Sequence, residues 1–175
     1  MTGSPPPVRQ GAAAALRELR TPGDVRLLIA MLGWAAVLPI LKYTIPLPRL
    51  VALAAAGTKG RERSSDKERR AKMFARWIYR SRREAPRDNC LERSLTLFRF
   101  LGRAGACPRL VVGVGREDAV TGHVWVLVDG EPVADSVEHV SGFARLVEFD
   151  ERGRGTTTDG TPIERSDART APPRS

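Results

Sequence analysis

The sequence predicts an α+β fold, in which a helix that begins at Cys90 packs on a small antiparallel sheet. Three observations predict this fold. Apolar residues recur at helical spacing over two segments, 65–84 and 90–102. Residues 110–149 contain short β-prone runs separated by turn residues. The length of 175 residues fits one domain with appendages and is enough to bury a core.

Residues 1–23 are expected to be a flexible arm, and residues 24–64 an apolar helical region with a basic linker. Two helices are predicted here, broken near Pro39 and again near Pro46, with Asp24 as an N-terminal cap. The longest uncharged run has 15 residues, whereas a membrane-spanning helix needs about 20 apolar residues. The run therefore argues against a membrane span. Packing or partner binding is favoured over contact with a membrane surface, because no basic face accompanies the apolar run.

Residues 65–150 are expected to form the core, which starts with two helices. The second helix opens at Cys90, where Asn89 and Glu92 have the spacing of a capping box. Arg93 and Arg99 on this helix should face solvent. The apolar positions expected to face the core are Ala71, Phe74, Ala75 and Ile78 in the first helix, and Leu91, Leu95, Phe98 and Leu101 in the second.

The remainder of the core is predicted to be sheet. The expected strands are 110–114, 123–128, 131–135 and 143–149. Residues 151–175 lack periodicity and are rich in Arg, Thr, Gly and Pro, so they are predicted to be a disordered tail.

The net charge of +9 belongs to one segment. Residues 57–87 contain 12 Lys and Arg against four Asp and Glu, and the rest of the chain is nearly neutral. The aromatic residues of this segment fit a core stripe as well as a stacking surface. A solvated helix face is therefore favoured over a nucleic-acid patch, although a basic binding module stays open as the non-enzymatic alternative.

The two cysteines cannot form a disulfide framework, and the N-terminus lacks a secretory pattern. We therefore expect a cytoplasmic protein with free thiols. No tract has metal-ligand spacing, and no cofactor or metal site is expected. Cys107 has no base placed for it, so it is interpreted as structural or incidental. His139 is expected to be a solvated residue in a loop.

Three residues in chain order could carry chemistry: Cys90 at a helix start, His123 at a strand start and Asp135 on the next strand. A helix N-terminus lowers the pKa of a thiol through the macrodipole and the free N–H groups. An imidazole can take the proton and return it to a leaving group, while a carboxylate fixes the ring. The backbone N–H of Cys90 is a candidate oxyanion donor.

The hairpin between His123 and Asp135 decides whether these two side chains can meet. A two-residue turn at Asp129 and Gly130 would set Val124 opposite Asp135, on the wrong face. A three-residue loop would set His123 directly opposite Asp135 on one face. The sequence allows the second register, which predicts Trp125 on the same side as His123.

Residues 89–149 resemble the transglutaminase-like, papain-related cysteine enzymes, and more narrowly the B2 leader peptidases of lasso-peptide biosynthesis. The motifs that carry the resemblance are Cys-Leu-Glu-Arg-Ser-Leu from Cys90 and His-Val-Trp-Val from His123. Matching these motifs residue by residue, the resemblance implies a triad of Cys90, His123 and Asp135. It departs from the family at Val124, where small residues are common.

This resemblance implies a cysteine peptidase that removes the leader of a lasso-peptide precursor before the macrolactam ring closes. It implies three partners: the precursor peptide, a separate leader-recognition protein of the B1 type, and an ATP-dependent macrolactam synthetase. No leader-recognition domain is visible in the N-terminal arm, so poor leader binding by this chain alone is expected. The basic segment and the apolar helices are candidate docking surfaces. Acyl transfer to an amine by the same triad stays open as the alternative reaction.

Overall fold

The computed structural model describes residues 19, 21–58, 60–80, 89–115 and 121–163. Helices and one antiparallel sheet follow one another along the chain, which confirms the predicted α+β class. The helices are α2 (Pro22–Thr44), α3 (Leu47–Ala55), α4 (Ser65–Arg80), α5 (Cys90–Arg103) and α6 (Val137–Ser141). The strands are β1 (Arg109–Gly115), β2 (Gly122–Val128), β3 (Glu131–Pro132), β4 (Phe143–Phe149), β5 (Gly155–Thr157) and β6 (Pro162–Ile163).

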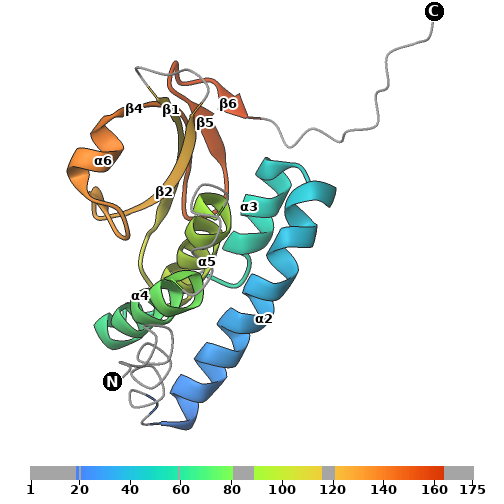
Figure 1. Cartoon of the computed structure of the whole chain (residues 1–175), viewed down its shortest axis with the longest axis vertical. Helices are drawn as coiled ribbons and strands as arrows, with labels where there is room; N and C mark the ends of the chain where they lie inside the picture. The colour runs from blue at the N-terminus through green and yellow to red at the C-terminus, as the bar shows by residue number, and fades with distance from the viewer. Residues whose placement is uncertain (1–18, 20, 59, 81–88, 116–120, 164–175) are drawn as a thin grey trace, which may run out of the picture.

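Helix α5 lies between the sheet and the other large helices, as Figure 1 shows. Its apolar residues Leu95, Phe98 and Leu101 are buried as predicted, and Leu91 is half-buried. The predicted stripe of α4, from Ala71 to Ile78, is also buried. Because α5 has this central position, it is buried on nearly all sides. Cys90 lies at the N-terminal end of this helix.

The apolar N-terminal region is one long helix followed by a short one, so the predicted break near Pro39 is wrong. Helix α2 continues through Pro39 and stops only before Pro46. The predicted cap is also wrong: Thr21 is the N-cap, and Asp24 closes a capping box three residues later. A proline inside a helix costs one backbone hydrogen bond. Burial of Met31, Ala35 and Leu38 against the core offsets this loss.

The outer side of α2 is apolar. Ile29, Ile40 and Tyr43 are 64%, 65% and 82% exposed. By length and composition alone, this helix of 23 residues is long and apolar enough to cross a membrane, with a mean hydropathy of 1.8 over its most apolar 18 residues. Its other side packs on α4 and α5, and its first turn contains the buried Asp24.

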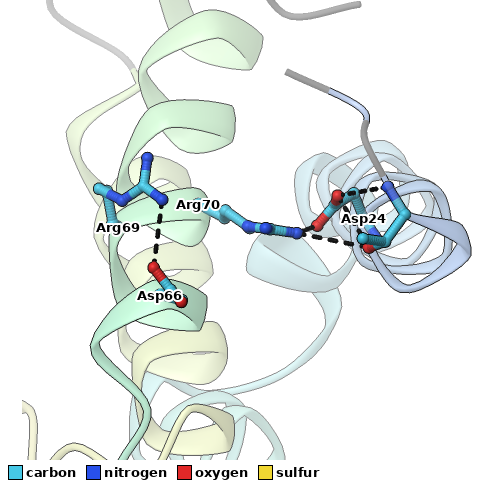
Figure 2. Close-up of polar contacts among 5 residues, drawn as sticks. Asp24, Asp66, Arg69 and Arg70 are labelled. Atoms are coloured by element: carbon cyan, nitrogen blue, oxygen red, sulfur yellow. Dashed lines mark hydrogen bonds and ion pairs between the residues drawn. The ribbon is translucent and has the colours of Figure 1, made fainter.

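Asp24 also joins the first turn of α2 to α4. Its carboxylate is only 2% exposed and forms an ion pair with Arg70. Figure 2 shows Arg70 reaching across to Asp24, whereas the neighbouring Arg69 stays on its own helix with Asp66. Several arginines of the basic segment are thus engaged within the chain.

The sheet has six strands in the order β3-β2-β1-β4-β5-β6. The prediction of a disordered tail is wrong over residues 151–163, because β5 pairs with β4 and β6 pairs with β5. Strands of three and two residues are too short to show a periodic pattern. The predicted disorder over 164–175, most of the predicted N-terminal arm and residues 81–88 lie outside the described residues.

Candidate active site

Cys90 is the first residue of α5 and is half-buried. Burial raises the pKa of its thiol, but a hydrogen bond with His123 and backbone hydrogen bonds from Val124 and Leu91 outweigh burial, and the net pKa is lowered. The start of a helix adds its positive dipole end and free N–H groups. Cys90 is therefore placed as an activated thiol.

The predicted capping box at this helix start is not formed. Asn89 occupies the N-cap position without a side-chain capping hydrogen bond. Glu92 instead forms a 2.8 Å ion pair with Lys42, near the end of α2. The carboxylate at the start of α5 thus joins α5 to the long N-terminal helix α2.

His123 lies near the start of β2 and contacts both other predicted site residues. Its Nε2 lies 3.3 Å from Oδ1 of Asp135, which leaves Nδ1 as the ring nitrogen available to the Cys90 thiol. Burial lowers the pKa of His123, but hydrogen bonds to Asp135 and Cys90 outweigh burial and raise it to about 9. The ring is therefore held as an imidazolium beside the thiol at neutral pH.

Asp135 reaches His123 by a different path from the predicted one. The hairpin has a two-residue turn: Val128 pairs with Glu131, and Asp129 and Gly130 have φ of 54° and 88°. The predicted three-residue loop is therefore wrong. The expected strand 131–135 ends at Pro132. Val133 still donates 3.0 Å to the carbonyl oxygen of Val126, and the chain bends over residues 133–135. In a regular strand after a two-residue turn, Asp135 would lie on the opposite face of the sheet from His123. The bend removes this obstacle, because the side chain of Asp135 no longer follows the alternation of the strand.

Arg93 binds Asp135, which the sequence analysis missed. Its Nη2 lies 2.6 Å from Oδ1 and 2.9 Å from Oδ2 of the carboxylate, so the expectation that Arg93 faces solvent is wrong. A signal was available, because residues three apart on a helix lie on the same face. Arg93 therefore shares a face with Cys90. Burial raises the pKa of Asp135, but the hydrogen bond from His123 and the charge of Arg93 outweigh burial, and the net pKa is lowered.

The second outward prediction on α5, for Arg99, is also wrong. Its guanidinium donates 2.8 Å to the carbonyl oxygen of Leu53 and lies over the ring of Trp34, 4.5 Å from its centroid. Arg99 thus connects α5 to α2 and α3. Charged side chains at both ends of α5 are used to join elements, which hydrophobic periodicity does not reveal.

Ser94 also fastens α5 to β2. Its buried hydroxyl donates 2.8 Å to the carbonyl oxygen of Val124, the residue after His123. One turn of α5 thus carries the thiol, the arginine that holds Asp135 and the hydroxyl that holds the base strand. The spacing of these groups on one helix fixes how thiol and imidazole face each other.

Aromatic rings surround the His123 imidazole. Trp125 lies beside it with the ring centroids 5.9 Å apart, on the side the pleat predicts. Phe143 lies 5.0 Å away and His139 4.9 Å away, the latter edge-on. His139 is exposed, as expected, but it belongs to α6 and contacts the site, so its assignment to a loop is wrong.

Cys107 lies at the other end of α5 from Cys90. It is an exposed free thiol just beyond the helix, which spans about 21 Å at its 14 residues. The structure therefore brings Cys90, His123 and Asp135 together and keeps Cys107 apart from them.

The comparisons with known proteins agree with this arrangement. No curated protein and no solved structure matches the chain. Residues 34–148 match the family model of the transglutaminase-like superfamily, and this stretch contains about half of α2, all of α3, α4, α5, α6, β1, β2 and β3, and all but the last residue of β4. The match covers well over half of the sequence and includes all three residues that meet at the head of α5, and so the chain belongs to the transglutaminase-like superfamily.

Proposed function

We propose that this protein is a cysteine peptidase whose nucleophile is Cys90. Members of its superfamily are typically cysteine proteases or acyltransferases. The observation that carries the proposal is the contact of His123 with both Cys90 and Asp135, which couples a thiol of lowered pKa to an imidazole of raised pKa. A thiolate beside an imidazolium is the resting state that such chemistry needs.

Each group has a role in the proposed cycle. Sγ of Cys90 attacks the scissile carbonyl carbon, and the protonated His123 gives its proton to the leaving amine. Water then attacks the acyl-enzyme, with His123 as general base. Asp135 orients the ring and stabilises the imidazolium. The backbone N–H of Cys90 lies in the first turn of the helix, where N–H groups have no helical acceptor, and it is the proposed donor to the oxyanion.

The proposed substrate is the leader-bearing precursor of a lasso peptide. The support is the pair of motifs at Cys90 and His123. The structure gives Arg93 and Ser94 of the first motif defined contacts at the site. We further propose that a separate leader-recognition protein delivers the precursor and that an ATP-dependent macrolactam synthetase takes the product. Both steps would occur in the cytoplasm.

Nucleic-acid binding by residues 57–87 is not proposed. Within the described part of this segment, Arg63 pairs with Glu68 and Asp129, Arg69 with Asp66, and Arg70 with Asp24. Intramolecular ion pairs leave fewer cations to neutralise phosphates, which is the main source of such affinity.

The test is cleavage of a precursor by the purified full chain together with the recognition protein, followed by mass spectrometry. Cys90→Ala should abolish cleavage, whereas Cys107→Ala should retain it. The product masses without and with an added ordinary amine distinguish hydrolysis from acyl transfer. A peptidase releases the leader as a free carboxylate when no amine is added, whereas an acyltransferase forms the amide of the added amine in preference to the carboxylate. Full cleavage by Cys90→Ala would refute the peptidase proposal.

The role of Asp135 has a matched control in Asp129. Asp135→Asn should lower turnover by about ten-fold or more, because the imidazole loses the carboxylate that fixes its tautomer. Asp129 lies in the hairpin turn, paired with the exposed Arg63, and Asn also suits that turn position. Asp129→Asn should therefore leave turnover nearly unchanged. Equal losses in both variants would remove Asp135 from the proposed triad.

A further inference from the structure

Three candidate ligands for a transition metal converge beside β2. His123, Asp135 and His139 each offer one ligand atom, and these atoms all lie within 4.8 Å of one another. Two imidazoles and a carboxylate are the donor set of many zinc sites. Their positions in the chain, separated by twelve and four residues, do not form a linear motif, so only folding brings them together.

The contact between His123 and Asp135 has the dimensions of a zinc site. Nε2 and Oδ1 are 3.3 Å apart, which is long for a charge-assisted hydrogen bond of about 2.7–2.9 Å. Two ligands bound at about 2.0–2.1 Å to a tetrahedral ion are roughly 3.3 Å apart. A zinc ion could thus bridge these two atoms without moving either residue.

His139 can supply the third ligand through a change of its own rotamer. Its side chain is exposed, and its ring already lies edge-on to His123, with 4.9 Å between the centroids. Its backbone is held by Ser136, the N-cap of α6. The carboxylate of Asp135 has lone pairs for both a metal and Arg93, which binds it from α5.

We propose that His123, Asp135 and His139 form a reversible zinc-binding site that switches the thiol off. Zinc at Nε2 of His123 replaces the hydrogen bond to Asp135 and occupies the nitrogen that fixes the tautomer. The ring can then no longer be an imidazolium, so it cannot act as the proton-carrying partner of Cys90. His139 has no part in the proposed cleavage and would serve as the metal-specific ligand.

The first experiment measures zinc binding to the full chain by calorimetry, in a Cys107→Ser background that removes the exposed thiol. One ion should bind, and His139→Gln should weaken binding by about ten-fold or more. Glu138→Gln is the matched control, because it removes a carboxylate next to His139 in α6 that is not one of the three clustered ligands. It should bind zinc as the parent does.

The second experiment follows alkylation of the thiols by iodoacetamide in the chain with both cysteines, with peptide mapping. Zinc should slow the labelling of Cys90 and leave that of Cys107 unchanged, and His139→Gln should abolish this protection. Neither readout needs a precursor, so both stay informative if the proposed peptidase function fails.

Two results would overturn the proposal. In one, zinc slows the alkylation of Cys90 and Cys107 equally, or it binds the His139→Gln variant as tightly as it binds the parent. In the other, Cys90→Ala abolishes binding while His139→Gln does not, which would place the ion between thiol and imidazole.

Discussion

Arg93 should set the pKa of His123 through Asp135, although it does not touch the imidazole. From the 2.6 Å and 3.3 Å contacts to Oδ1, its charge lies at most about 6 Å from Nε2 of His123. Two unit charges at this distance repel by about 0.7 kcal/mol in water and about 3 kcal/mol at an effective dielectric constant of 20. Arg93 is 27% exposed, so an intermediate value applies.

The variant Arg93→Met removes this repulsion and leaves the carboxylate of Asp135 unneutralised. The pKa of His123 should therefore rise by about one unit above its value of about 9. Turnover should fall by about ten-fold, because Asp135 loses the group that holds it in place. Arg93→Lys keeps the charge and should leave the pKa of His123 close to that of the parent.

Nuclear magnetic resonance titration of the imidazoles measures this directly, since the chain has only two histidines. The alkaline limb of kcat/KM should move with the titration. An unchanged or lowered pKa in Arg93→Met would show that Arg93 only supports the local structure, and it would refute the electrostatic coupling.

Three further outcomes are expected. In the parent protein, activity should fall to half near pH 9, because His123 loses the proton that the leaving amine needs. The measurement is the pH profile of kcat/KM, and an alkaline midpoint far from pH 9 would contradict this expectation. Lys42→Met leaves the 2%-exposed Glu92 uncompensated and should cost about 3 kcal/mol in urea unfolding, with most of the loss restored when Glu92→Gln is added. Gly105→Ala should lower the free energy of unfolding by about 2 kcal/mol or more, because φ is 86° and a Cβ would lie 2.4 Å from the backbone carbonyl oxygen of Glu62. Gly160→Ala is the control for backbone strain alone, because φ is 85° there and a Cβ would enter open space.

The sequence determined the elements whose signals are local. Hydrophobic spacing identified the buried faces of α4 and α5, and β-prone runs located β1, β2 and β4. The order of Cys90, His123 and Asp135 along the chain was enough to nominate the site. These inferences succeed because a helix or strand of seven or more residues repeats its pattern of burial in its own sequence.

The sequence did not determine the path of the hairpin. The expected register depended on whether the hairpin loop has two or three residues. Three were expected, whereas the structure has two. Val133 still donates to the carbonyl oxygen of Val126, but the chain bends over residues 133–135, so that Asp135 meets His123 outside the pleat. Alternation along a strand does not apply to a residue that has left the strand.

Only the tertiary structure decided which charged residues belong to the site and which join elements. Arg93 and Arg99 were expected to face solvent because hydrophobic periodicity treats every charge as solvated, and Glu92 was expected to cap its own helix. Each instead meets a partner more than 40 residues away in the chain. The same holds for Pro39, which a local rule places at a helix end but which packing keeps inside α2. Long-range pairing and burial can each outweigh a local preference, and neither can be predicted from the spacing of neighbouring residues.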